Sequence, residues 1–140
     1  MKQLFLTWII LLAIVGLGLA QTQKTLVKTF PVTTETETVT FAMKGDATVT
    51  EWEKETIRIV TTIKAQNIEE KVLKALIIAG RYNYQVTLDK ELGTATFDLP
   101  KMERTIFING KDLEDVLEFE IFIPQGLDYQ ITMPNAPLLL

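Results

Sequence analysis

The sequence predicts a mainly β domain, a compact β-sandwich or short β-roll with one α-helix, and three observations support this fold class. Apolar and polar residues alternate with a period of two in several short runs. Turn residues, mostly glycine, asparagine and proline, separate these runs. One segment, at about residues 67–79, has helical spacing instead. Short strands at regular spacing are typical of two-layer β folds, and a right-handed single-stranded β-helix is the alternative.

The first twenty residues have the organisation of a secretory signal peptide. Lys2 precedes an apolar run from Leu4 to Leu19, and the small residues Gly18 and Ala20 stand where a signal peptidase requires them. We therefore expect residues 1–20 to be removed and residues 21–140 to form one secreted β-rich domain without a membrane span. An uncleaved membrane anchor is the other interpretation of this run.

The strands are predicted from alternation, as in the run where Val39, Phe41 and Met43 are separated by Thr40 and Ala42. The predicted strands are, in chain order, Thr25–Phe30, Glu37–Met43, Ala47–Trp52, Ile57–Ile63, Tyr82–Leu88, Thr94–Leu99, Thr105–Ile108, Val116–Ile123 and Tyr129–Met133. A hairpin through Lys44-Gly45-Asp46 would pair the second and third of these strands antiparallel, whereas a β-helix would stack its strands in parallel.

The predicted helix, at about 67–79, is apolar on nearly all sides. Ile68, Val72 and Leu76 follow helical spacing, and Gly80 ends the pattern. Asn67 and Glu70 have the spacing of a capping box, in which each side chain hydrogen-bonds the backbone of the first turn. We expect the helix to pack across an open sheet or a barrel end.

Composition excludes several chemistries. The chain has 14 basic and 18 acidic residues, a net charge of −4, and neither histidine nor cysteine. It also contains no serine. Serine and cysteine nucleophiles, histidine bases and the usual zinc sites are therefore absent, and no cofactor or metal is expected. Mild, mixed acidity argues against nucleic acid as a partner, because nucleic acids select basic surfaces.

A carboxylate-dependent glycan hydrolase is the remaining enzymatic alternative, because it requires only two acidic groups across a cleft. Outward positions on strands usually hold carboxylates as solvated or edge-protecting charges, so we expect no catalytic residues and no enzyme. The available acids are Glu35, Glu37, Asp46, Glu51, Asp98, Glu118 and Glu120.

Three aromatic residues are the candidate binding residues. Tyr82 and Tyr84 lie two positions apart, so on a strand they would share one face, and Trp52 ends another predicted strand. Such aromatics stack on sugars or anchor a partner, although they also serve as packing residues with a polar tip.

The run from Gly45 to Lys54, with Ile57-Arg58-Ile59 after it, resembles a repeat of the bacterial putative-adhesin and toast-rack-like domains. In that repeat a glycine–aspartate pair is followed by a strand, a tryptophan, a charged turn and another strand. The resemblance is strongest over residues 39–63. It implies a β-helical or β-roll surface domain with a non-enzymatic role, and it transfers no catalytic residue.

Together these features predict a non-enzymatic, adhesin-like surface binding module. Its location is expected to be secreted, periplasmic or at the outer cell envelope. The expected partner is an envelope protein or a glycan, which the sequence does not identify further.

Overall fold

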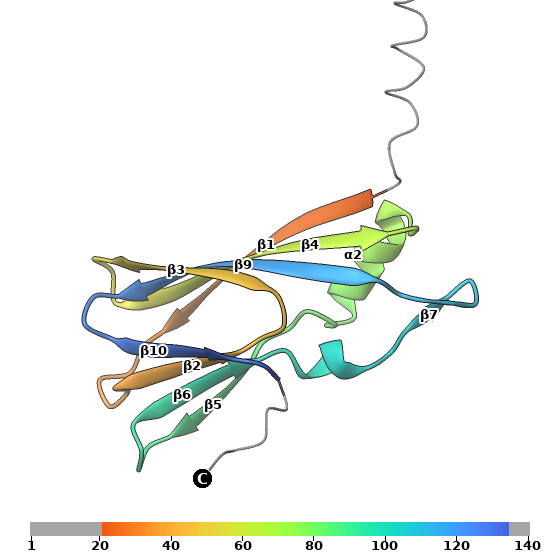
Figure 1. The fold of residues 1–140 in the computed structure, drawn as a ribbon. Helices are drawn as coiled ribbons and strands as arrows, with labels where there is room; N and C mark the ends of the chain where they lie inside the picture. Colours follow the sequence, from red (N-terminus) through yellow and green to blue (C-terminus); the bar gives the residue numbers. More distant parts are fainter. Residues whose placement is uncertain (1–20, 135–140) are drawn as a thin grey trace, which may run out of the picture.

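Two four-stranded sheets packed face to face form most of residues 21–134, which are the residues described in the computed structural model (Figure 1). Sheet A contains, in spatial order, β1 (Gln21–Pro31), β4 (Thr56–Gln66), β9 (Asp115–Pro124) and β3 (Asp46–Trp52). Sheet B contains, in spatial order, β10 (Asp128–Thr132), β2 (Thr38–Ala42), β6 (Thr94–Asp98) and β5 (Gln85–Asp89). The remaining elements are α2 (Glu70–Ile78), the 3-10 helix η1 (Pro100–Glu103) and a small hairpin of β7 (Phe107–Ile108) and β8 (Lys111–Asp112). The predicted mainly β sandwich with one α-helix is confirmed.

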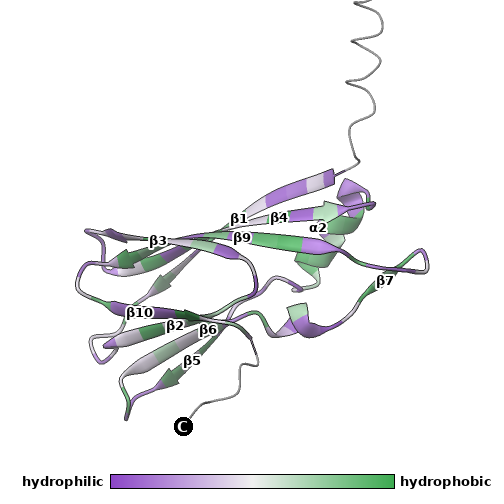
Figure 2. Ribbon diagram, in the orientation of Figure 1, coloured by the Kyte–Doolittle hydropathy of each residue, from purple (hydrophilic) through white to green (hydrophobic). Residues whose placement is uncertain are grey.

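The core lies between the two sheets and follows the predicted alternation. Along β4, Ile57, Ile59 and Ile63 are buried, with at most 1% of each exposed, and the residues between them are largely half-buried on the outer face. Hydrophobic segments are visible on β2, β4 and β9 (Figure 2). One inward position is polar: Thr61 is buried and its hydroxyl hydrogen-bonds the Tyr84 hydroxyl. The period of two therefore identified the buried face of β4 correctly.

Strand pairing is mixed, which separates this fold from a single-stranded β-helix. The β1–β4, β4–β9 and β5–β6 pairs are antiparallel, whereas β3–β9, β2–β6 and β2–β10 are parallel. The hairpin between β2 and β3 does not form, because these strands belong to different sheets. Val49 instead pairs with Ile121 on β9.

Gly45 makes the crossing from sheet B to sheet A possible. Its φ is +146°, and a Cβ atom there would lie 2.2 Å from the backbone oxygen of Leu117. Since real Cβ atoms do not approach that closely, only glycine fits. The sequence signal that suggested a hairpin turn thus marks a close backbone contact between β9 and the connection from β2 to β3.

Helix α2 is shorter than predicted, and its predicted cap is wrong. Its N-cap is Glu69, which makes no side-chain capping bond, whereas Asn67 has a left-handed φ of 60°. Asn67 thus belongs to the turn before the helix, a conformation that asparagine tolerates better than most residues. Leu73 is buried, while Ile78 is 86% exposed. The helix packs beside β1, where Lys24 pairs with Glu70.

Several strand boundaries also differ from the prediction, and two of these differences change the assignment of a segment. The strand predicted from Tyr82 begins at Gln85, because residues 79–84 form the connection that leaves α2. The strand predicted at 105–108 is limited to β7, which pairs with β8 across the Asn109-Gly110 turn. The predicted signal peptide, residues 1–20, lies outside the described residues.

Candidate functional site

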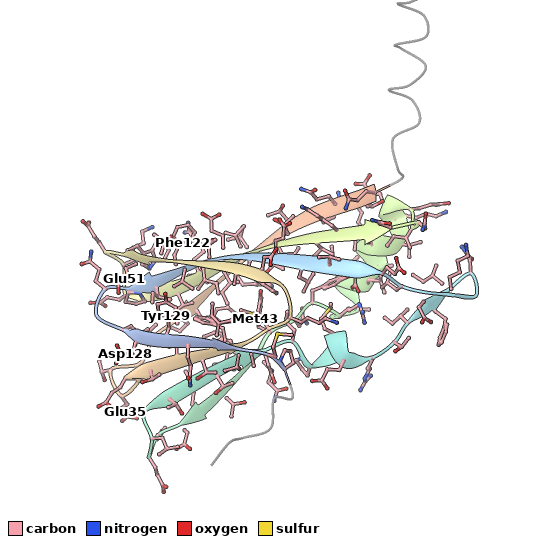
Figure 3. All side chains as sticks on the ribbon, in the orientation of Figure 1. Glu35, Met43, Glu51, Phe122, Asp128 and Tyr129 are labelled. Carbon is pink, nitrogen blue, oxygen red and sulfur yellow. The ribbon has the colours of Figure 1, made fainter. Side chains whose placement is uncertain are left out.

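Trp52 is half-buried at the end of β3, on the outer face of sheet A. Its ring centroid lies 5.3 Å from that of Phe122, whose label marks the outer side of the sheet in Figure 3. The Arg58 guanidinium and the Lys54 ammonium lie 5.0 and 5.1 Å from the indole centroid. The indole N–H donates a 2.7 Å hydrogen bond to the Thr56 carbonyl. Residues of its own chain thus hold this ring in place.

The two predicted tyrosines lie in the connection from α2 to β5 and point into the protein. Tyr82 is 2% exposed, and its hydroxyl donates a 2.8 Å hydrogen bond to Asp115 Oδ2. Tyr84 is half-buried, with its ring 5.8 Å from that of Phe30. Burial raises the pKa of both phenols above the usual value. The structure therefore brings neither tyrosine to a common face with Trp52.

Arg81 and Asp115 form a buried ion pair beside Tyr82. Their side chains are 6% and 5% exposed, and Arg81 Nε and Nη2 donate to the two Asp115 oxygens at 2.9 and 3.1 Å. Arg81 Nη1 also donates to the backbone carbonyls of Lys101 and Arg104. Acceptors from two chain segments thus receive the hydrogen bonds of the guanidinium. A buried charge requires such partners, because it is removed from water. We refer to Arg81, Tyr82 and Asp115 as the buried cluster.

A groove of about 970 Å³ opens next to the buried cluster, at one end of the sandwich. Its larger apolar lining residues include Met43, Leu99, Met102, Leu113, Leu117 and Met133. Its charged rim contains Lys44, Glu103, Arg104, Asp112 and Glu114. In Figure 3, Met43 lies where β2 ends, close to η1 and away from the β3–β4 turn.

The groove has a fixed floor and a more accessible rim. Met43 and Leu117 are 2% exposed, Met102 and Leu113 are half-buried, and Met133 is 59% exposed. The buried cluster joins η1 to the start of β9, so it holds two walls of the groove together. Methionine side chains adapt to differently shaped apolar groups, which favours binding of an apolar side chain over chemistry on it.

The acids considered for glycan hydrolysis lie elsewhere. None of the seven lines the groove, and Glu118 is engaged by Lys64 at 2.7 Å. Glu35 lines a smaller pocket of about 220 Å³ with Asp89, formed by the loops after β1 and β5. The large groove holds other carboxylates, and Asp115 among them is already bound by Arg81 and Tyr82.

Within residues 21–134, no group of three or more acidic side chains is placed to hold a metal ion. No helix in the same range is long and apolar enough to cross a membrane.

Sequence reasoning did not identify the groove, because its lining comes from segments far apart in the chain. Met43 and Leu117 follow the strand pattern and predict only burial. The one available signal was the long connection from Pro100 to Glu114, which lies between two clearly predicted strands and contains both apolar and charged residues. Such connections often carry binding residues.

Comparison with known proteins gives little to transfer. No family model and no curated protein matches the sequence. A crystal structure from Clostridium sporogenes, described as a "putative cell adhesion protein", is similar with a TM-score of 0.42 and 8% sequence identity. The similarity covers 79% of this chain and 46% of that one, so the chain spans about half of its length.

Proposed function

We propose that this chain is a secreted or cell-envelope binding module of adhesin-like type, without catalytic activity, and that the groove is its binding site. The observation that carries the proposal is the groove of about 970 Å³ with a methionine-rich apolar lining and a charged rim. Ligand sites are typically concave, mainly apolar and edged by a few polar groups. The signal-like residues 1–20 support export.

The chemistry of the groove favours a protein partner over a glycan. Among the residues that line it, none is aromatic, whereas sugar sites usually contain an aromatic ring for stacking. A partner that inserts an apolar side chain would cover Met102 and Leu113. The rim carries both signs of charge, because Lys44 and Arg104 are basic whereas Asp112 and Glu114 are acidic. Polar groups of a partner around the inserted side chain could pair with these charges, which would fix the orientation of the partner.

Met133→Glu tests this proposal with little risk to the fold. Met133 lines the groove and is 59% exposed, and Val27→Glu on the outer face of β1 is a matched control because Val27 is 57% exposed. Binding is measured to envelope fractions that lack the protein. We expect Met133→Glu to weaken this binding by about tenfold or more, since the substitution places a charge against the apolar floor of the groove. Binding would be measured with the labelled, exported protein by centrifugation. Equal binding by both variants and the wild type would contradict the assignment of the groove.

The hydrolase alternative is tested on the same preparations. The rim carboxylates Asp112 and Glu114 are the observation in its favour. Release of reducing sugars from envelope glycans by the wild type, lost in Asp112→Asn or Glu114→Gln, would replace the binding proposal with an enzymatic one. We expect no release above the buffer control.

A further inference from the structure

Within residues 21–134, each four-stranded sheet has two edge strands, and the edge strands of sheet A carry opposite charges. In β1 the only charged residues are Lys24 and Lys28, and in β3 they are Asp46 and Glu51. Lys24 is engaged by Glu70, but within residues 21–134 neither Lys28 nor Glu51 has an ion-pair partner. Both side chains belong to the inward-facing row of their strand, next to Leu26 and Val49 respectively.

The edges of sheet B expose apolar residues on the row that faces the core. On β5, Val86 and Leu88 are 37% and 52% exposed, and their register partners on β6 are the buried Phe97 and Ala95. On β10, Tyr129 is 45% exposed and pairs with the buried Val39. Ile131 is 44% exposed and pairs with Phe41. Both edge strands of sheet B therefore carry inward-facing apolar side chains that the protein covers only in part.

The two sheets are stacked so that matching edges lie on the same side. Phe30 on β1 contacts Phe97 on β6 and Tyr84 just before β5, at centroid distances of 5.0 and 5.8 Å. These contacts place the β1 edge over the β5 side. The β3 edge lies over β10, and Figure 1 shows these two strands next to each other. If a second copy is shifted sideways by one sandwich width, its β1 lies beside β3 of the first copy, and its β5 lies beside β10 of the first copy.

Strand direction permits this arrangement. β1 is antiparallel to β4, β4 is antiparallel to β9, and β9 is parallel to β3, so β1 and β3 run in the same direction. A parallel register that places Leu26 of the next copy beside Val49 also places its Lys28 beside Glu51. Both pairs then fall on the inward face, where cross-strand neighbours interact.

We propose that copies of this chain associate side by side, with β1 of one copy adding in parallel to β3 of the next. The same contact places Val86 and Leu88 against Tyr129 and Ile131, so both sheets continue across the interface. A contact between two different edges leaves the pair with one free edge of each kind, at its two ends, and repetition of the contact produces a filament. The groove lies beyond the ends of these strands, and none of the interface residues named above lines it.

Inward-facing charges on edge strands can also prevent strand pairing between copies. Charge reversal distinguishes charges that promote association from charges that prevent it. Under the proposal, Glu51→Lys and Lys28→Glu each place like charges together and should weaken association about 5- to 30-fold. The double variant restores opposite charges and should assemble as the wild type does. Glu120→Lys is the matched control, because Glu120 is exposed on the interior strand β9.

A mixing experiment gives the sharpest result. When Lys28→Glu and Glu51→Lys proteins are combined in equal amounts, alternation of the two makes every interface attractive, so the mixture should assemble where each protein alone does not. Sedimentation velocity and negative-stain microscopy of the exported protein would measure this, with circular dichroism as the check on folding. A wild type that stays monomeric up to its solubility limit overturns the proposal, and so does assembly that neither single reversal weakens.

Discussion

Asp115 and Asp98 both place carboxyl oxygens away from solvent, but they differ in their hydrogen-bond partners. Asp115 accepts hydrogen bonds from Arg81 Nε, Arg81 Nη2 and the Tyr82 hydroxyl, at 2.9, 3.1 and 2.8 Å. Asp98 Oδ1 is buried, yet it has no hydrogen-bond partner within the described residues. Burial, together with the nearby charge of Glu103, raises the pKa of Asp98 above its usual value.

The difference shows which carboxylate supports the structure. The partners of Asp115 connect the end of α2, η1 and the start of β9, segments that are far apart in sequence. Removing one member of such a buried pair leaves a charge that water cannot reach. Among the residues that the structure describes, no side-chain hydrogen bond or ion pair joins Asp98 to another segment, so its ionised form costs stability without linking parts of the fold. A buried carboxyl in this domain is therefore not by itself a sign of catalysis.

The largest expected effect is the loss of stability on removing Asp115. Asp115→Ala should lower the free energy of unfolding by about 3 to 5 kcal/mol, because Arg81 would remain buried without its counter-ion. Urea denaturation followed by circular dichroism would measure the change. Glu118→Ala is the control: in its ion pair with Lys64 the two side chains are 46% and 30% exposed, so water reaches the charges and the loss should stay below about 1 kcal/mol. Equal losses in the two variants would contradict the importance assigned to the buried cluster.

The sequence predicted the fold class and the inward faces because both follow from local periodicity. The alternation along Ile57, Ile59 and Ile63 is visible without knowing any strand partner. Pairing was not predictable in the same way: Val49 pairs with Ile121, and no local signal encodes a contact over that separation. Gly45 was identified as a turn, but its closeness to Leu117 depends on where β9 lies.

The candidate binding residues show the same limit. Two tyrosines separated by one residue predict a shared face only if the segment is extended, and here it is the connection that leaves α2. The charges that complete the buried cluster, Arg81 and Asp115, lie more than thirty residues apart and neither has a distinctive neighbourhood. The groove could be predicted only after η1 and β9 were placed beside each other.

A second, smaller effect isolates one hydrogen bond of the buried cluster. Tyr82→Phe keeps the ring and removes the hydroxyl that donates to Asp115, so we expect a loss of about 1.5 to 3 kcal/mol, the usual range for a bond to a charged group. Chemical denaturation of wild type and variant gives the value. If the loss is negligible, Arg81 alone satisfies Asp115, and the role given to Tyr82 is wrong.

Arg58 extends the comparison to a cation without an ionic partner. Its Nε is buried and unbonded within the described residues, and its guanidinium contacts only the Trp52 ring among the interactions found there. Arg58 and Trp52 are half-buried on the outer face of sheet A, and a cation–π contact outside the desolvated core contributes about 0.5 to 1 kcal/mol, so Arg58→Ala should cost less than about 1 kcal/mol. The measurement is again the urea midpoint, with Ile59→Ala on the opposite face expected to cost about 2 to 5 kcal/mol. A loss for Arg58→Ala as large as that for Ile59→Ala would show that the cation–aromatic group supports the sheet.

The smallest effect, and the only expected gain, belongs to Asp98. Because the folded state raises its pKa, the native protein favours the protonated carboxyl, and stability falls as pH rises from the unfolded-state pKa of about 3.9 through the folded value. Asp98→Asn cannot ionise, so it should be more stable than the wild type at neutral pH by less than about 0.5 kcal/mol.

That gain should disappear on acidification, since below about pH 4 the wild-type carboxyl is protonated in both states and resembles the amide. Urea titrations of wild type and Asp98→Asn at neutral pH and at about pH 3 test the sign and its pH dependence together. Asp115→Asn provides the opposing case, because the amide cannot neutralise Arg81 and the variant should lose stability at neutral pH. A gain for Asp98→Asn that is the same at both pH values would mean that the amide acts through a new hydrogen bond. In that event Asp98 has an uncharged structural role, and the contrast with Asp115 rests on hydrogen bonding alone.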